Sequence, residues 1–126
     1  MKREIFATGA PWEDKVGYCR AVKVGNTIEI SGTAPVRNGE TAGETAYEQA
    51  KVCLEIIEET LTRAGARLEN VVRTRMFVTD ISQWEEFGRA HGEYFGTIKP
   101  ATSMVEVAAL IDPKMLIEIE ATAVVG

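Results

Sequence analysis

The chain has 126 residues, and 14 basic against 19 acidic side chains leave it with a net charge of −5. We expect a single domain over residues 1–126, because this length suits one hydrophobic core. An acidic chain without a dense cluster of lysine or arginine lacks the electrostatic footprint of a nucleic-acid binder, so we expect no nucleic-acid partner. No run of about eighteen apolar residues predicts a membrane span. The N-terminus lacks the apolar core of a signal peptide, which favours the cytoplasm.

The N-terminal part of the chain predicts strands. Residues Glu4–Ala7 form a short candidate strand. Cys19–Val24 and Thr27–Ser31 are two further candidates, separated by Gly25 and Asn26. A glycine–asparagine pair between two apolar runs is typical of a tight β-hairpin.

Two helices follow from apolar spacing. From Thr45 to Ala64, apolar side chains recur at steps of three and four. Thr45 with Glu48 three residues later predicts a capping box at the start of this helix. A second helix is predicted from Ser82 to Phe95, with Trp84 and His91 on its inward stripe.

Three more strands complete the pattern, at Val71–Thr79, Thr102–Ala109 and Leu116–Val125, and we expect the last two to pair with each other. The order predicts an α+β fold in which two helices cover one face of a six-stranded mixed sheet. The other face is then expected to carry Met104, Ala108, Leu116, Glu118 and Glu120. A half-apolar, uncovered sheet face favours packing against other subunits.

No phosphate loop, nucleophile elbow or dinucleotide fingerprint occurs, so we expect no cofactor. One histidine and two distant cysteines cannot supply the four ligands of a zinc site, so we expect no metal. Catalysis would therefore depend on scattered groups. Glu118 and Glu120 share a strand face, with Glu106 a candidate to face them. Clustered carboxylates repel one another, which raises the pKa of one of them toward general acid–base use; a solvated sheet edge is the alternative.

Two further side chains have both a structural and a functional interpretation. His91 is either a paired core or interface histidine or a proton donor or acceptor toward a ligand. Arg20 is either an ordinary surface arginine or a bidentate clamp for a carboxylate near a subunit boundary.

The order and spacing of several motifs resemble the Rid family of imine and enamine deaminases, also called YjgF-type proteins. The resemblance covers essentially the whole chain. It is carried by Gly17-Tyr18, Ile30-Ser31-Gly32, Phe77-Val78-Thr79-Asp80, Lys99-Pro100-Ala101-Thr102-Ser103-Met104-Val105-Glu106-Val107 and Ile117-Glu118-Ile119-Glu120-Ala121. It implies a chorismate-mutase-like fold and a homotrimer, with small-molecule pockets where the subunits meet around a central barrel.

The resemblance also implies site residues. Active family members hydrolyse 2-iminopropanoate or 2-iminobutanoate to a 2-oxo acid and ammonia. Tyr18, Gly32 and Glu118 match the family's tyrosine, glycine and water-activating glutamate. The family's carboxylate-binding arginine is replaced by Thr102, and a usual cysteine by Met104.

This departure defines the functional expectation. A threonine hydroxyl cannot replace a planar, charged guanidinium, so we expect classical deaminase turnover to be slow or absent. The features around Arg20, His91 and Thr102 resemble a branch of the family that lacks the arginine, and Arg20 and His91 are candidates to reshape the pocket. The chain is then either a hydrolase for a related C–N bond with Glu118 as its catalytic group, or a trimeric metabolite-binding protein without turnover.

Overall fold

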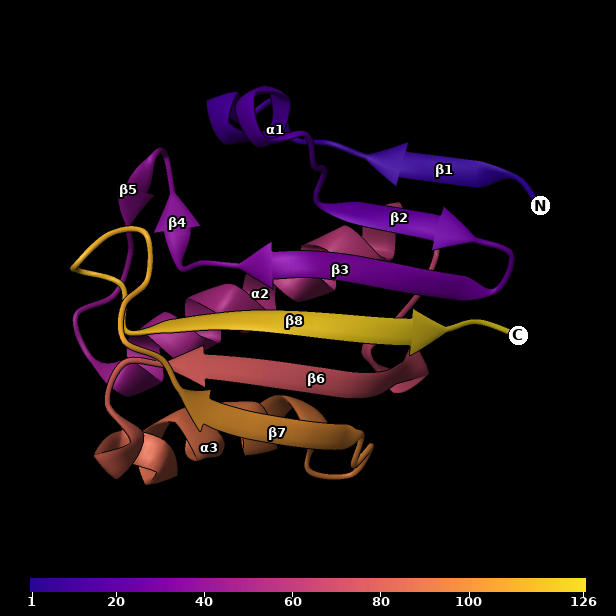
Figure 1. Ribbon diagram of the computed structural model, residues 1–126. Helices are drawn as coiled ribbons and strands as arrows, with labels where there is room; N and C mark the ends of the chain where they lie inside the picture. The colour runs from indigo at the N-terminus through magenta and orange to yellow at the C-terminus, as the bar shows by residue number, and fades with distance from the viewer.

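The computed structural model describes residues 1–126 as a six-stranded sheet with two long helices behind it (Figure 1). The order across the sheet is β1-β2-β3-β8-β6-β7. The six strands are β1 (Arg3–Phe6), β2 (Ala21–Val24), β3 (Thr27–Thr33), β6 (Val71–Val78), β7 (Ala101–Glu106) and β8 (Ile117–Val124). A separate two-stranded ladder consists of β4 (Val36–Arg37) and β5 (Glu40–Thr41).

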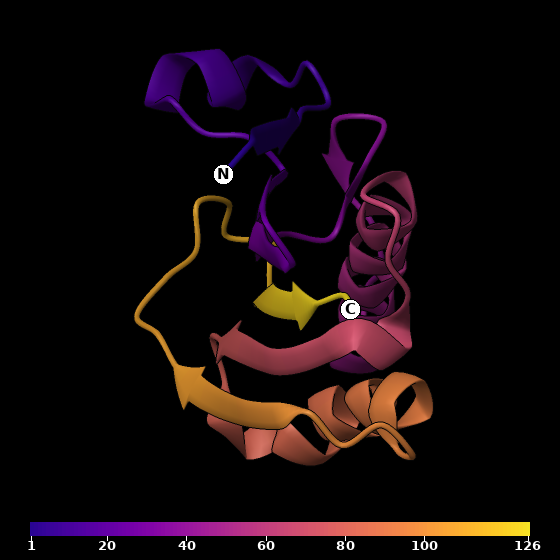
Figure 2. The same ribbon diagram turned by 90° about the vertical axis from the view of Figure 1, so that its right-hand side faces the viewer.

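The helices are α1 (Pro11–Val16), α2 (Ala46–Arg63) and α3 (Trp84–Phe95), with short 3-10 turns at Leu68–Asn70 and Ile81–Gln83. The long helices α2 and α3 both cover the same face of the sheet, as Figure 2 shows edge-on. The predicted α+β architecture, with a mixed sheet and two helices on one side, is confirmed. No helix combines the length and the apolar character that crossing a bilayer would require.

The position of the C-terminal strand differs from the prediction. Strand β8 does not pair with β7; it lies between β3 and β6 and is antiparallel to both. Strand β7 instead pairs with β6 in parallel. A parallel pair needs a crossover, which α3 supplies, and this places β7 at the edge of the sheet. The chain then returns to the centre of the sheet, where β8 has a neighbour on each side.

The core lies between the sheet and the two helices. Along β8 the side chains alternate strictly, with Ile117, Ile119, Ala121 and Ala123 buried and the residues between them more exposed. Helix α2 packs its predicted apolar stripe against these strands. Central β8 is therefore two-faced, with one side in the core and the other turned away from the helices.

Two β-bulges shift this alternation. In β6 an irregularity between Val71 and Arg73 leaves Val71 buried with Thr74, whereas Val72 is exposed. Strict alternation over the whole strand would place Val71 on the opposite side from Thr74. In β3 a second irregularity lies between Ile30 and Thr33, at Ser31 and Gly32. An inserted residue re-aims the side chains around it, and such bulges are frequent beside functional sites.

The first turn of α3 also differs from the prediction. The helix was expected to begin at Ser82, but this residue lies in a 3-10 turn capped by Asp80, which accepts a hydrogen bond from the Ser82 backbone amide at 3.0 Å. Helix α3 therefore begins only at Trp84, which lies in its first turn and is 57% exposed rather than in the core. A Cβ added to Gly88 or Gly92 would meet nothing within 4 Å, so no neighbouring backbone within the subunit explains these glycines.

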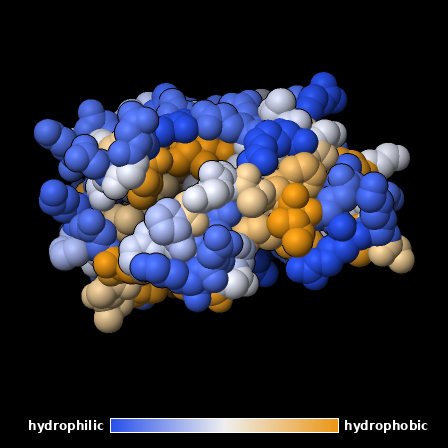
Figure 3. Space-filling view, turned by 90° about the horizontal axis from the view of Figure 1, so that it is seen from above, coloured by the Kyte–Doolittle hydropathy of each residue, from blue (hydrophilic) through white to orange (hydrophobic).

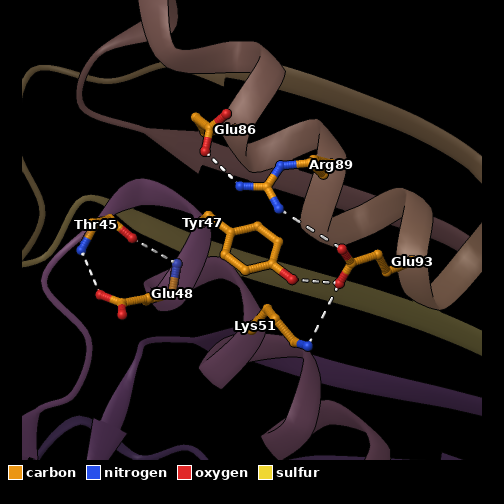
Figure 4. Close-up of polar contacts among 7 residues, drawn as sticks. All are labelled: Thr45, Tyr47, Glu48, Lys51, Glu86, Arg89 and Glu93. Carbon is orange, nitrogen blue, oxygen red and sulfur yellow. Dashed lines mark hydrogen bonds and ion pairs between the residues drawn. The ribbon is translucent and has the colours of Figure 1, made fainter.

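A polar cluster joins α2 to α3 at the surface (Figure 4). The Tyr47 hydroxyl donates a 2.6 Å hydrogen bond to Glu93, and the Arg89 guanidinium lies 3.7 Å from the centre of the Tyr47 ring. Glu93 also forms an ion pair with Lys51 at 3.5 Å, and Arg89 forms one with Glu86 at 2.7 Å. Exposed pairs of this kind contribute little individually. Together they link the exposed faces of the two helices.

The capping box of α2 provides a test of the fold. The Thr45 hydroxyl accepts from the Glu48 amide at 3.1 Å, and the Glu48 carboxylate accepts from the Thr45 amide at 3.1 Å. We expect Thr45→Ala to lower the free energy of unfolding by about 1 kcal/mol, because the helix loses its N-cap. Chemical denaturation measures the change. Thr62→Ala in the last turn of α2 removes only a hydroxyl bonded to the Glu58 carbonyl, so a loss as large as that of Thr45→Ala would contradict the capping argument.

Candidate functional site

The face of the sheet opposite the helices is open. It is flanked by α1 at one end and by the 107–116 loop, which swings out on the side away from the helices (Figure 2). Glu118 and Glu120 extend onto this face from β8, because the residues that alternate with them are buried against the helices. The predicted pairing of these two glutamates on one strand face is confirmed. Glu106 does not face them: it accepts a hydrogen bond from the Ile81 amide at 2.9 Å, at the start of the segment that leads into α3.

Glu118 lies against the β3 bulge. A Cβ added to Gly32 would overlap the Oε2 atom of the Glu118 carboxylate, so the glycine leaves the space that this carboxylate occupies. No side chain other than hydrogen fits at that position without moving Glu118. The bulge and the glycine together bring the β3 backbone into contact with the Glu118 carboxylate on β8.

Arg20 joins the residues around Glu118. Its Nη2 donates a 2.8 Å hydrogen bond to the Gly32 carbonyl, and its Nη1 donates to the Thr33 hydroxyl at 3.4 Å. The guanidinium carbon lies 5.6 Å from the centre of the Tyr18 ring. The structure thus brings Tyr18, Arg20, Gly32 and Glu118 together, four of the seven candidate residues. Because Arg20 is already bonded to the β3 backbone, it supports the bulge as well as facing the open surface.

The electrostatics of this group favour a protonatable carboxyl. Burial raises the pKa of Glu118 above its ordinary value, and the neighbouring charge of Glu120 raises it further, whereas Arg20 lowers it. Glu120 itself is only loosely paired, 3.8 Å from Arg75 on β6. Burial outweighs the attraction of Arg20, so the Glu118 pKa lies closer to neutrality than that of an exposed glutamate.

The remaining three candidates lie on the other face. The Thr102 hydroxyl is 2.6 Å from the Thr74 hydroxyl, which is 2.8 Å from Nε2 of His91 on α3. Met104, two residues along β7, packs against the core that the helices cover. Both Met104 and Leu116 had been expected on the open face. Parallel pairing places Met104 beside buried Met76 of β6, and Leu116 packs against the core cluster just before β8.

Thr74 is the residue of this set that sequence reasoning missed. It is fully buried in β6, and both of its hydrogen-bond partners are site candidates. A usable signal existed, because Thr74 is the one polar residue in a stripe that continues with Met76 and Val78. A hydroxyl buried among apolar neighbours needs a polar partner, and that partner is worth seeking.

His91 is half-buried beside the ring of Phe95, with 4.8 Å between the ring centres. Burial lowers its pKa below the ordinary value of 6.5, because desolvation disfavours the charged imidazolium. The imidazole is therefore neutral at pH 7 and can either donate or accept at Nε2 according to its tautomer.

Other possible sites are poorer. No three histidine, cysteine, aspartate or glutamate side chains gather closely enough to hold a metal ion. Two shallow surface hollows of about 450 and 420 Å³ adjoin the 107–116 loop, and none of the seven candidate residues lines either of them. These two hollows thus lie apart from the candidate residues.

The raised pKa of Glu118 has a testable consequence for stability. The folded state favours protonated Glu118, so its contribution is present below the ordinary pKa of 4.5 and is lost as the pH rises through the folded pKa. At pH 7 the ionised group therefore costs stability. We expect Glu118→Gln to raise the melting temperature at pH 7 by about 1–4 °C and to have no such effect near pH 4.

Thermal unfolding at both pH values measures this difference. Glu29→Gln is the matched control, because Glu29 lies two strands from the sheet edge on the same face and accepts a 2.6 Å hydrogen bond from Thr122. A Glu118→Gln protein that melts below the unaltered protein at pH 7 would show that the attraction to Arg20 outweighs burial.

Comparison with known proteins places this geometry in a family. The family profile described as Endoribonuclease L-PSP matches residues 10–125. A RutC family protein of Pyrococcus abyssi is 39% identical over 126 residues, which cover 97% of this chain and 96% of that protein.

Solved structures agree. A Mycobacterium tuberculosis protein described as a member of the highly conserved YjgF/YER057c/UK114 family is 46% identical, with a TM-score of 0.92 over 98% of this chain and 100% of its own. A Yersinia pestis protein of the conserved Rid family, YyfA, described as of unknown function, is 28% identical, with a TM-score of 0.86 over 98% and 100% of the two chains. By sequence and by fold, the chain belongs to the YjgF/Rid family, which also bears the names RutC and L-PSP.

Proposed function

We propose that the protein is a Rid-type hydrolase that cleaves a carbon–nitrogen double bond in a small molecule, with Glu118 as its catalytic group. The observation that carries the proposal is the Glu118 carboxylate itself. It is half-buried against Gly32 with its pKa raised by burial, and it contacts a glycine rather than a fixed partner. A carboxylate in this state can take a proton from water near neutral pH.

The reaction follows from that role. Glu118 accepts a proton from a bound water molecule while the water oxygen forms a bond to the imine carbon. The electron pair of the C=N bond moves to nitrogen, which takes up a proton. Collapse of the resulting carbinolamine releases ammonia and leaves the carbonyl compound. Backbone amides near Gly32 or Ser103 are candidates to stabilise the negative charge that develops in the transition state.

The complete site requires more than one copy of the chain. Thr102 occupies the position of the family's carboxylate-binding arginine, yet within a subunit it lies on the helix-covered face of the sheet, whereas Glu118 lies on the open face. Alternation along the strands keeps these two groups on opposite sides. In the proposed homotrimer, Glu118 of one copy faces Thr102 of a neighbour at each subunit boundary.

The surface supports such an assembly. Apolar side chains are exposed along the open sheet at Ile5, Val24, Val105 and Val124, and Ile111 in the flanking loop is 72% exposed. Trp12 and Val16 of α1 add to them at the end of the molecule. Seen from that end, hydrophobic patches interrupt the charged surface (Figure 3). Exposed apolar area of this extent is typical of a face that another chain covers.

The substitution at position 102 restricts the substrate. Thr102 offers a neutral hydroxyl, so the site lacks the charged fork that would hold the carboxylate of a 2-imino acid. We place the chain in a Rid branch without the arginine, whose substrate presents a neutral polar group there. The alternative is a metabolite-binding protein without turnover. The hydrogen bond from Arg20 to the Gly32 carbonyl favours this alternative, because an arginine already bonded to the backbone is less available to a substrate beside Glu118.

Restoring the arginine tests this assignment. We expect 2-iminopropanoate hydrolysis by the unaltered protein to be slow. Thr102→Arg should raise it by at least about tenfold, because a hydrogen bond to a charged group contributes about 1.5–3 kcal/mol. A coupled assay with lactate dehydrogenase measures the pyruvate formed. Thr102→Lys supplies charge without the planar fork and should gain less. Rapid turnover by the unaltered protein, or no gain on Thr102→Arg, would refute the role given to position 102.

A mixed assembly tests the subunit boundary. The double variant Thr102→Arg/Glu118→Gln should be inactive because it lacks the glutamate, and the unaltered chain should be slow because it lacks the arginine. Co-expressed, the two should form assemblies in which the arginine of one copy meets Glu118 of another, and 2-iminopropanoate turnover should appear. Sedimentation equilibrium should give three times the chain mass. A monomeric particle, or mixtures no more active than their components, would contradict the proposed site.

A further inference from the structure

Three side chains from three elements form a relay of two consecutive hydrogen bonds on the helix-covered face of the sheet. His91 on α3, Thr74 on β6 and Thr102 on β7 are joined by contacts of 2.8 and 2.6 Å. The middle residue, Thr74, is fully buried, whereas His91 is half-buried and Thr102 is exposed. The buried Thr74 hydroxyl therefore connects a half-buried imidazole to a hydroxyl at the surface of the subunit.

The two hydrogen bonds donate in the same direction, from Thr102 toward His91, when Nε2 of His91 is the acceptor. A hydroxyl has one proton to donate, so Thr74 cannot donate to both of its partners. When Nε2 of His91 accepts from Thr74, Thr74 accepts from Thr102. All three groups are then satisfied, and the Thr102 oxygen keeps its remaining lone pairs free at the surface. A hydroxyl whose proton already points toward a base is the usual form of an activated nucleophile.

We propose that Thr102 is a nucleophile activated by His91 through Thr74, and that it attacks uncharged activated acyl compounds. All three residues lie within one subunit, so the acylation does not require Glu118, although Thr102 also faces the Glu118 of a neighbour in the proposed homotrimer. Thr102 is the catalytic residue, because its hydroxyl would meet the substrate. Thr74 and His91 are positioning residues that act through it.

The reaction with an aryl ester shows the balance. The Thr102 oxygen bonds to the acyl carbon, its proton passes to Thr74, and the proton of Thr74 passes to Nε2 of His91. The bond from the acyl carbon to the aryl oxygen breaks, and the aryloxide leaves with its electron pair. The product is an acyl-threonine beside an imidazolium. No oxidant, reductant or metal is needed.

The surroundings of His91 suit a neutral base. Of the charged groups of α3, Glu86, Arg89 and Glu93 are paired with one another or with Tyr47 and Lys51 of α2. The fourth, Glu85, is exposed in the first turn of the helix. The two cations of β6 point away from His91: Arg73 donates to Ser103 at 2.8 Å, and Arg75 pairs with Glu120 on the open face. Burial alone lowers the His91 pKa, and no charged group contributes to the shift. The imidazole is thus available to accept a proton above the lowered value.

The experiment uses p-nitrophenyl acetate as the probe. The full chain is incubated with the ester, release of p-nitrophenolate is followed by absorbance, and the acetylated residue is located by peptide mass spectrometry. We expect acetyl-Thr102, with a rate that falls as the pH drops through the His91 pKa, below 6.5. As the only histidine, His91 gives a single set of imidazole NMR signals, which should show a proton on Nδ1 and none on Nε2.

Variants separate the relay from simple exposure. Thr74→Val should lower the rate of Thr102 acetylation by at least about tenfold, since removal of base assistance costs about 10²–10⁴ in established cases. Thr102→Ser should keep the reaction and Thr102→Val should abolish it. Thr62→Val, at an exposed hydroxyl bonded only to the Glu58 carbonyl, should change nothing. If Thr74→Val misfolds, His91→Gln gives the same test from the other end of the relay.

Three results would overturn the proposal. One is acetylation confined to His91 or to lysines with Thr102 unmodified. Another is equal labelling of Thr102 in the unaltered protein and in a folded Thr74→Val protein. The third is an NMR spectrum with the proton on Nε2 of His91. Glu118 takes no part in the acylation. Failure of imine hydrolysis would therefore leave all three readouts unaffected, and the two proposals are tested separately.

Discussion

The alternation of side chains along β6, β8 and β7 is the constraint on which the remaining structure depends. Helices α2 and α3 cover one face of the sheet, and the strictly alternating burial of β8 follows from that. The same alternation assigns Glu118 to the open face. Parallel pairing with β6 assigns Thr102 to the covered one. No side-chain movement brings these groups together within a subunit, because only a shift in strand register exchanges the two faces.

The two faces differ in how they treat polar groups. On the open face, the β3 bulge and Gly32 bring backbone against the Glu118 carboxylate, and Arg20 bonds to that backbone instead of to the carboxylate. The result is a raised pKa and an unclamped acid. On the covered face, Thr74 has no access to water and must pair inside the protein, which aligns His91 with Thr102. On the open face the Glu118 carboxylate has no hydrogen-bond partner among its neighbours, whereas on the covered face all three polar side chains are hydrogen-bonded to one another.

Sequence reasoning succeeded where local rules act alone. The capping box at Thr45 and the apolar spacing that follows it predicted α2 almost to the residue, because helix periodicity and capping are local. The hairpin at Gly25 formed as expected, with that glycine at a φ of +60°. The position of β8 was predicted wrongly because pairing between distant strands depends on the whole sheet. Neighbours in sequence, here β7 and β8, need not be neighbours in space.

The candidate residues show the same division. Tyr18, Gly32 and Glu118 were named from their place in motifs, and the structure gathers them with Arg20; Thr102, Met104 and His91 were named with them but lie on the other face. Met104 was expected on the open face because β7 was expected to pair with β8, whereas β7 pairs in parallel with β6. Thr74 was passed over because a threonine is common in strands and attracts no notice by type. Its significance comes from being buried between two other polar groups, which only the packing of α3 onto β6 and β7 creates.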